Sequence, residues 1–191
     1  MSNAFCTTAF HEASHVIVAQ RLGLAVHSVS IRALNSERGR PLGGATVIRW
    51  DLLLGKREDR QLCRDAMTAA YAGIAWESLA SGRTFDEVFP DCPSDSDAVA
   101  DIRRRFNERS AFPTDEDSRQ TSTNARDGAC AMVVEHKNDI ERFAWFLCFK
   151  RDLSETQIDS WFGRAGITRA ALAFFGRTGC QFERFLGTKE N

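Results

Sequence analysis

The amino-acid sequence predicts a mainly α-helical protein with one small β-hairpin or sheet. Helical periodicity covers most of the 191 residues, whereas strict alternation of apolar and polar residues is confined to two short stretches. Hydrophobic residues make up 43% and charged residues 27% of the chain, as in ordinary globular domains that bury one core. We therefore expect a single domain over residues 1–191, in which residues 164–191 form a helical C-terminal extension.

The first predicted helix begins near Thr7 and Thr8 and ends before Gly23. Either threonine can cap a helix, and apolar residues recur at helical spacing along residues 9–19. Gly23 follows the last periodic residue, as glycine commonly does where a helix ends. Because so much of the stretch is apolar, we expect this helix to be mostly buried.

Two strands are predicted after this helix. Residues 25–31 alternate apolar and polar side chains, which favours a strand with one buried face. A polar loop over residues 35–41 follows, and residues 43–50 form a second predicted strand that starts with two glycines. Glycines in a strand often mark the close approach of another part of the chain. The two strands are expected to form a hairpin or a small sheet.

Helices account for the other predicted elements. They are expected over residues 56–79, 94–106, 121–148 and 154–162. The first of these is rich in small residues, which suits close packing on another helix, and Gly82 is its predicted stop. Ser94 and Ser154 are the expected caps of the second and fourth. Residues 110–119 are polar and are expected to form an exposed loop.

His11, Glu12 and His15 form an HExxH pattern inside the first predicted helix. Residues i and i+4 share a face of a helix, so the two imidazoles can bind one Zn²⁺. Glu12 can reach a water molecule on that metal and act as a general base. The metzincin extension is absent, because its Gly and His positions hold Val18 and Arg21. The pattern therefore predicts a zinc hydrolase site that needs a further ligand.

The third protein ligand of such a zinc ion must come from elsewhere in the chain. Glu77 lies in the small-residue helix, an apolar setting in which a carboxylate needs a partner. An acidic cluster follows at Asp95, Asp97 and Asp101. His27 and His136 are alternatives, although a lone histidine is more often structural or exposed. Spacing alone leaves these alternatives open.

Composition and charge disfavour several other classes of protein. A formal net charge of −1 disfavours nucleic-acid binding by phosphate neutralisation. The six cysteines have no CxxC spacing, which disfavours a zinc ribbon or a thioredoxin-like site. No apolar run approaches the length of about 20 residues that spans a membrane. Free cysteines and the lack of an export signal predict a cytoplasmic protein.

Five segments of the chain occur in the order found in one family of proteases. They are FHEASH at residues 10–15, VHSVSI at 26–31, GGAT at 43–46, YAGIAWESLASG at 71–82 and SDSD at 94–97. This order resembles the peptidase domain of the FtsH family of ATP-dependent zinc proteases, over residues 5–163. The resemblance implies an FtsH-peptidase-like zincin fold and a Zn²⁺ cofactor.

The resemblance also implies roles for the site residues. His11 and His15 match the family's zinc-binding histidines, and Glu12 matches its general base. Asp97 lies where the family's third zinc ligand opens a helix, with Asp95 as the alternative if the register slips by two residues.

One further residue acquires a role from the resemblance, and one segment acquires a role from its own sequence. Glu77 matches a glutamate of the family and is expected to hold the site from outside the ligand shell. Independently of the resemblance, the glycines and the expected exposed edge of the second predicted strand, around residues 43–48, suggest that it binds an extended peptide by adding it as a further strand. Its substrate-binding residues would be Gly43, Gly44, Ala45 and Thr46.

The predicted function is that of a free-standing zinc metalloendopeptidase acting on a peptide or unfolded protein. It is expected to work without ATP, because no GxxxxGK[ST] motif occurs in the sequence. One alternative is a catalytically weak or inactive FtsH-peptidase-like binding or adaptor module. Another is a peptidase subunit that assembles as a homo-oligomer or needs a separate ATPase partner.

Overall fold

The computed structural model describes residues 3–32, 43–109, 111–112 and 114–163. The chain divides into two compact units, Met1–Glu155 and Thr156–Asn191, which are described separately. The predicted C-terminal extension and the predicted loop at residues 35–41 lie outside the described residues. None of the helices in the described ranges is long and apolar enough to cross a membrane.

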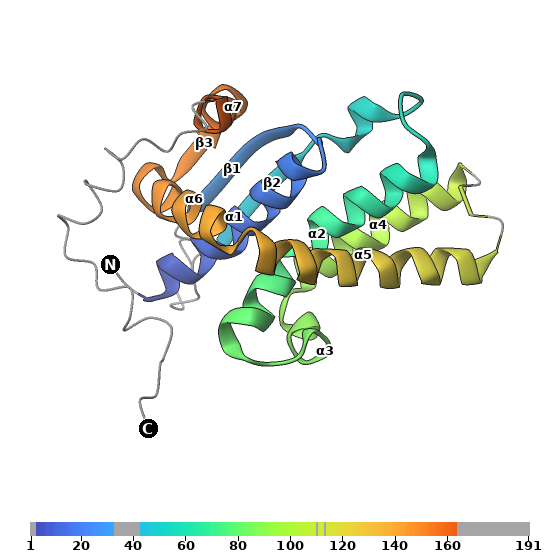
Figure 1. The fold of residues 1–191 in the computed structure, drawn as a ribbon, viewed down its shortest axis with the longest axis horizontal. Coiled ribbons are helices and arrows are strands. Elements are labelled where there is room, and N and C mark those ends of the chain that lie inside the picture. The colour runs from blue at the N-terminus through green and yellow to red at the C-terminus, as the bar shows by residue number, and fades with distance from the viewer. Residues whose placement is uncertain (1–2, 33–42, 110, 113, 164–191) are drawn as a thin grey trace. The chain divides into compact units, whose positions relative to one another are not determined.

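The first unit is mainly helical and contains one three-stranded antiparallel sheet (Figure 1), which confirms the coarse fold class. Its elements are α1 (Asn3–Arg21), β1 (Val26–Arg32), β2 (Gly43–Ile48), η1 (Trp50–Leu53), α2 (Asp59–Ser81), α3 (Phe85–Val88), η2 (Phe89–Asp91), α4 (Pro93–Glu108), α5 (Asp115–Glu135), α6 (Lys137–Lys150) and β3 (Asp152–Ser154). The described part of the second unit belongs to α7 (Glu155–Gly163).

Helix α1 lies at the centre of the first unit (Figure 1), with α2, α6 and the strands β1 and β2 packed around it. Residues 9–19 are all buried except His11, which is half-buried. A helix covered on every side needs apolar residues all round, which the sequence of this stretch supplies. The expectation of a mostly buried helix is therefore confirmed, and it fixes the surroundings of the HExxH pattern.

The two ends of α1 compare differently with the prediction. The helix begins at Asn3, so Thr7 and Thr8 lie inside it and the predicted start is wrong. Threonine costs little inside a helix when the residues before it continue the hydrogen bonding. The predicted end is correct: Gly23 has a φ of +70°, a left-handed conformation that glycine adopts without strain.

The sheet has the strand order β2-β1-β3, and the predicted hairpin is formed by β1 and β2. The third strand, β3, is not predicted from the sequence, because three residues are too few to give a strand pattern. Val29 of β1 pairs with Thr46 of β2 on one side and with Leu153 of β3 on the other. Paired residues share a face of a sheet. Because Val29 and Leu153 are buried, this is the inner face of the sheet.

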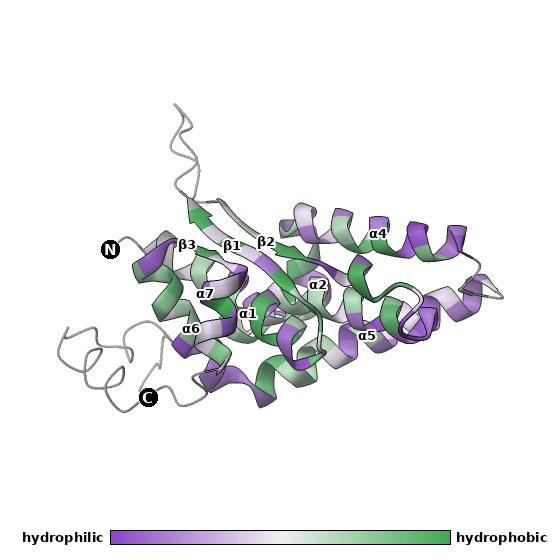
Figure 2. Ribbon diagram, turned by 90° about the horizontal axis from the view of Figure 1, so that it is seen from above, coloured by the Kyte–Doolittle hydropathy of each residue, from purple (hydrophilic) through white to green (hydrophobic). Residues whose placement is uncertain are grey.

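Helix α2 packs against α1, α4 and α5, and its residues 65–76 are all buried. Many of these residues are alanine or glycine, whose small side chains allow another helix to come close, as predicted. The helix ends at Gly82, which has a φ of +69° and is the predicted stop. Helices α4 and α5, by contrast, carry many hydrophilic residues (Figure 2).

Helix α4 begins one residue earlier than predicted, at Pro93, with Cys92 in the N-cap position. Proline is favoured at the first position of a helix, where its missing N–H costs nothing. Ser94 therefore lies in the first turn and is not the cap, so the predicted cap is wrong.

The long helix predicted over residues 121–148 is two helices, α5 and α6, which meet at His136 (Figure 1). His136 has a φ of −102° and a ψ of +18°, outside helical values, so the helix is interrupted there. Helix α5 also begins earlier than predicted, within the expected loop at residues 110–119. Thr114 caps it by accepting a hydrogen bond from the N–H of Asp117.

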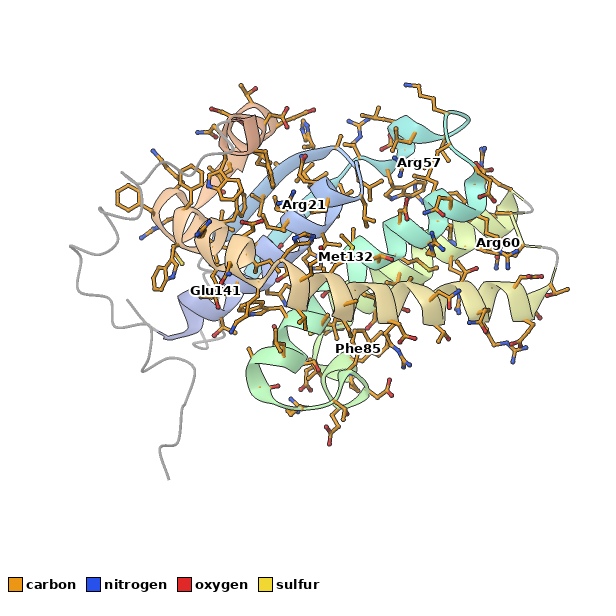
Figure 3. All side chains as sticks on the ribbon, viewed as in Figure 1. Arg21, Arg57, Arg60, Phe85, Met132 and Glu141 are labelled. Atoms are coloured by element: carbon orange, nitrogen blue, oxygen red, sulfur yellow. The ribbon has the colours of Figure 1, made fainter. Side chains whose placement is uncertain are left out.

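Ion pairs join the helices at the surface of the first unit. Arg21 of α1 pairs with Asp139 of α6 at 2.7 Å, and Arg60 of α2 pairs with Asp117 of α5 at 2.7 Å (Figure 3 labels both arginines). Exposed pairs of this kind contribute about 0–1 kcal/mol each. The packing of α1 on α2 and on the sheet is therefore the main support of the site described next.

Candidate metal site

The two histidines of the HExxH pattern lie on the side of α1 that faces α2 and α4. Their ring centres are 4.9 Å apart, as expected for residues one helical turn apart. Glu12, between them in sequence, points to a different side of α1, towards strand β2. One turn of helix thus presents two imidazoles to one neighbour and a carboxylate to another.

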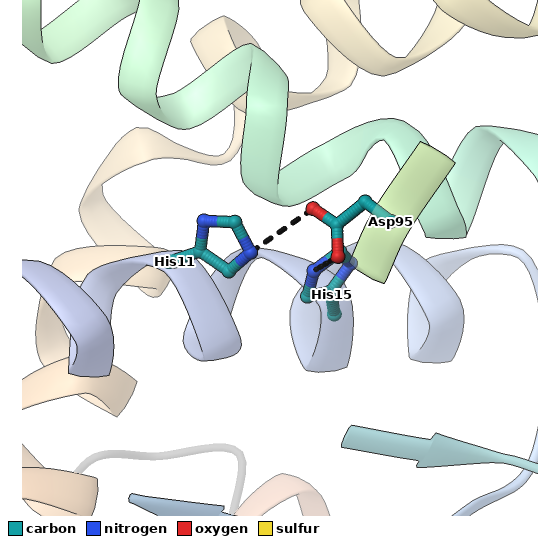
Figure 4. A group of neighbouring side chains, drawn as sticks. All are labelled: His11, His15 and Asp95. Carbon is teal, nitrogen blue, oxygen red and sulfur yellow. Dashed lines mark ion pairs between the residues drawn. The ribbon is translucent and has the colours of Figure 1, made fainter. Parts of the chain in front are cut away.

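Asp95, in the first turn of α4, closes the site (Figure 4). Its Oδ2 lies 3.0 Å from Nε2 of His11 and its Oδ1 lies 3.5 Å from Nε2 of His15. The three residues form a group that could hold a metal ion. The structure therefore brings Asp95, the alternative of the sequence prediction, to the histidines.

Asp97, the preferred third ligand of the sequence prediction, is not brought to the site. It is exposed, whereas Asp95 is buried. Two residues along a helix correspond to a rotation of about 200° around its axis, so Asp95 and Asp97 lie on opposite sides of α4. The contacts of Asp95 with His11 and His15 show that the side of α4 that faces α1 is the side of Asp95.

The Nδ1 atoms of both rings have acceptors of their own. Nδ1 of His11 lies 2.8 Å from Oε1 of Glu77, and Nδ1 of His15 lies 2.8 Å from the carbonyl oxygen of Ala69. A carbonyl or carboxylate oxygen only accepts, so each Nδ1 donates a proton. Each neutral ring then has its lone pair on Nε2, which is the arrangement that metal-binding histidines usually have. Glu77 thus contacts the histidine pair from outside, through His11, and its predicted role in holding the site stays a prediction.

The interior of the site has an electrostatic imbalance. Both Nε2 lone pairs face the carboxylate of Asp95, and Oδ2 of that carboxylate accepts no hydrogen bond from the described residues. Lone pairs and a carboxylate repel one another in a buried setting. A cation or protons must therefore lie among these groups.

The pKa values of His11, His15 and Asp95 are shifted by the same contacts. Burial lowers the pKa of His11, but its close contacts with the carboxylates of Asp95 and Glu77 outweigh burial and raise it to about 10. The pKa of His15 is also raised, because the contact with Asp95 outweighs complete burial. Burial acts to raise the pKa of Asp95, but the two histidines hold it well below its ordinary value. Without a metal ion, protons on the rings balance the carboxylate.

Gly73 of α2 leaves room beside both Nε2 atoms. A methyl group at this residue would lie 2.4 Å from Nε2 of His11 and 2.6 Å from Nε2 of His15, closer than any non-bonded contact. Any side chain there would fill the space between the rings and α2. From sequence, residue 73 is expected only to be part of a small-residue helix. Glycine within a helix costs about 1 kcal/mol relative to alanine, and that cost is the signal that could have singled it out.

Glu12 lies in a cleft of about 330 Å³ next to the histidines. Thr46 of β2 donates a hydrogen bond of 2.6 Å to Oε2 of Glu12. One wall of the cleft is β2 with η1, and the other is α4. The lining residues are Glu12, His15, Gly44, Ala45, Thr46, Ile48, Trp50, Ala66, Ala70, Ser94, Asp95, Ala98, Asp101 and Ile102. Of the four residues predicted to bind substrate, Gly44, Ala45 and Thr46 line this cleft.

The other candidate ligands of the sequence analysis lie elsewhere. His27 is exposed and lies 3.3 Å from Glu155, and His136 is at the junction of α5 and α6. The structure adds Cys92, which the sequence analysis does not single out, and which forms a second possible metal-binding group with His11 and Glu77. That group shares His11 with the first. Burial also raises the pKa of the Cys92 thiol to about 12, with nearby carboxylates adding to the effect.

Neither protein-family models nor curated protein sequences match this chain. The resemblance to the FtsH family therefore stays a prediction, and function has to be inferred from the site itself.

Proposed function

We propose that this protein is a zinc-dependent metallopeptidase that hydrolyses peptide bonds in peptides or unfolded proteins. The observation that carries the proposal is the convergence of the Nε2 atoms of His11 and His15 on the Asp95 carboxylate, with a second carboxylate, Glu12, one residue from His11. Two imidazoles and one carboxylate are a donor set that zinc takes in catalytic sites. Asp95, rather than Asp97, is the proposed third ligand.

The residues of the chain fit this donor set in three respects. Each histidine is oriented through its Nδ1 atom, by Glu77 or by the carbonyl group of Ala69. Oδ2 of Asp95 is a buried acceptor without a hydrogen bond from the described residues. Gly73 keeps the space beside the Nε2 atoms free.

Zinc in such a site supplies a Lewis acid that polarises a carbonyl group and lets water attack it near neutral pH. In the proposed reaction Glu12 takes the proton from the attacking water and passes it to the leaving amine. Glu12 is 5% exposed and opens on the cleft, so it can act on a substrate there while bulk water is mostly kept away. General-base catalysis of this kind contributes about 10²- to 10⁴-fold to the rate.

The proposed substrate is an extended peptide, because one wall of the cleft is an edge strand. β2 pairs with β1 on one side, and no strand within the described ranges pairs with its other side. Backbone N–H and C=O groups at a free edge can pair with a peptide. N-methylation of a substrate peptide at alternate residues should then raise KM, since every second amide would point to β2. Equal effects at all positions would contradict strand pairing.

A second candidate function is a non-catalytic binding module of the same fold. The observation that favours it is that protons can also balance Asp95, given the raised pKa values of His11 and His15. In that case the three residues form a buried ion cluster that stabilises the packing of α1 on α4.

Metal content separates these two functions. The protein is purified without chelator, its zinc content is measured by mass spectrometry, and hydrolysis of fluorescently labelled casein is followed. A zinc peptidase should hold about one zinc ion, and Glu12→Gln should keep that ion while losing about 10²- to 10⁴-fold in kcat. Failure to bind zinc at micromolar concentration would leave the binding module as the better explanation.

A further inference from the structure

Thr46 of β2 has its hydroxyl group against the proposed general base. Its Oγ1 donates to Oε2 of Glu12 at 2.6 Å and lies 3.4 Å from the main-chain oxygen of the same residue. The sequence explains this direction, because Thr46 pairs with Val29, which is 1% exposed. Paired residues share a face, so the hydroxyl group of Thr46 points inward to α1, whereas the free edge of β2 lies in the plane of the sheet.

Gly44 lies two residues before Thr46 and therefore on the same face of β2. A methyl group at residue 44 would lie 2.3 Å from Oε1 and 2.4 Å from Cγ of Glu12. The Glu12 side chain is thus pressed against the backbone at Gly44 and hydrogen-bonded at Thr46. Two neighbouring positions of one strand confine this carboxylate, and each confines a different oxygen.

We infer that Thr46 is a positioning residue for Glu12, a role that rests on the proposed function. By engaging Oε2, Thr46 leaves Oε1 as the oxygen that takes the proton from the attacking water. A carboxylate held in one orientation presents that oxygen at every encounter, whereas a freely rotating one does so only part of the time. From its sequence position Thr46 is expected to bind substrate; the geometry assigns its hydroxyl group to Glu12 instead.

The same contact couples the base to the substrate-binding edge. Thr46 belongs to the strand whose outer edge lines the cleft, and its inner face carries the hydroxyl group that orients Glu12. A peptide that pairs with β2 therefore binds to the same strand that positions Glu12. Loss of the hydroxyl group should lower the rate of the chemical step and leave peptide binding unchanged.

The test compares Thr46→Val with Thr46→Ser in the full chain loaded with zinc. Valine has the shape of threonine and favours strands, but it has no hydroxyl group. Thr46→Val should lower kcat by about 10- to 100-fold, which is less than the loss expected when the general base itself is removed. KM should change by no more than about twofold. Thr46→Ser restores the hydroxyl group and should recover most of kcat. Ser30→Ala removes a hydroxyl group from the opposite face of β1 and is the matched control, with kcat unchanged.

Two readouts besides activity accompany the kinetics. Zinc content should be the same in all four proteins, because the hydroxyl group of Thr46 bonds to Glu12, which is not a proposed zinc ligand. Crystal structures should place the Glu12 carboxylate as in the wild type for Thr46→Ser and in a rotated position for Thr46→Val. Should Thr46→Val fail to fold, Thr46→Ala provides the same comparison.

The outcomes separate this inference from the proposed function. If Glu12→Gln retains full hydrolysis, or the wild type hydrolyses nothing, the proposed function fails and the positioning role fails with it. If Glu12→Gln abolishes hydrolysis while Thr46→Val keeps a wild-type kcat, the positioning role alone is overturned. A loss of activity in Thr46→Val that is matched by loss of zinc or by a higher KM also overturns it.

Discussion

Gly73→Ala should abolish zinc binding although it is a favourable substitution for a helix. The new methyl group would lie 2.4 Å from Nε2 of His11 and 2.6 Å from Nε2 of His15. Carbon atoms in ordinary contact are about 3.5 Å apart, so the rings must withdraw by about 1 Å. Metal–ligand distances in a working site vary by only about 0.2 Å. We expect the zinc affinity to fall by at least about a hundredfold. This is at least as large as the fall in affinity seen when the hydrogen-bond partner that orients a metal-binding histidine is removed.

The same substitution should change the stability of the metal-free protein only slightly. Alanine is favoured over glycine inside a helix by about 1 kcal/mol, whereas overpacking costs about 1–3 kcal/mol. The free energy of unfolding of Gly73→Ala should therefore lie within about 2 kcal/mol of the wild type. Urea unfolding followed by circular dichroism, in the presence of a chelator, measures this difference. If Gly73→Ala is folded but does not bind zinc, the loss of affinity is due to a change at the metal site and not to unfolding.

Gly128→Ala is the matched control for this experiment. Gly128 is in α5, and a methyl group there would lie 3.6 Å from Oγ1 of Thr68, an ordinary contact. This variant should gain about 0.5–1 kcal/mol in stability and keep its zinc affinity, as measured by competition with a chromophoric chelator. If Gly73→Ala bound zinc as tightly as Gly128→Ala, an ion shared by the two Nε2 atoms would be ruled out.

Three further predictions concern the same site. Asp95→Asn should lower zinc affinity by at least about a hundredfold, whereas Asp97→Asn should leave it unchanged. Competition with a chelator measures both affinities, and the reverse result would make Asp97 the ligand. Glu77→Gln should weaken zinc binding by about 10- to 100-fold, because it removes the charge that orients His11; an unchanged affinity would make Glu77 a packing residue. Zinc binding should tighten as the pH rises from 6 to 8, by about tenfold per pH unit for each proton displaced. Affinity should rise with pH because His11 has a pKa of about 10 in the metal-free protein, so zinc must displace its proton. A zinc affinity that is independent of pH would contradict this assignment.

The pairing of His11 with His15 follows from the sequence alone, because residues four apart meet on one face of any α-helix. The β1–β2 hairpin and the stops at Gly23 and Gly82 are equally local, since each depends on side-chain alternation or on the backbone freedom of glycine. These features need no knowledge of the rest of the chain. They supply two of the three proposed ligands and the general base.

The third ligand depends instead on the rotation of α4 about its axis. Asp95 and Asp97 have similar sequence surroundings, and the packing of α4 on α2 decides which of them faces α1. Propensities place the end of a helix only to within one or two residues, and one or two residues turn a helix by about 100–200°. The choice between the two aspartates was therefore beyond a local pattern.

Contacts between distant segments decide the rest of the site for the same reason. Gly73 clears space for rings that lie some sixty residues earlier in the chain, and Thr46 reaches Glu12 across the interface between a strand and a helix. Sequence patterns record which face of an element is apolar, but they do not record which element will cover that face. The helix alone arranges His11, Glu12 and His15, whereas the packing of α2, α4 and β2 around it supplies Asp95, the free space and the orientation of the base.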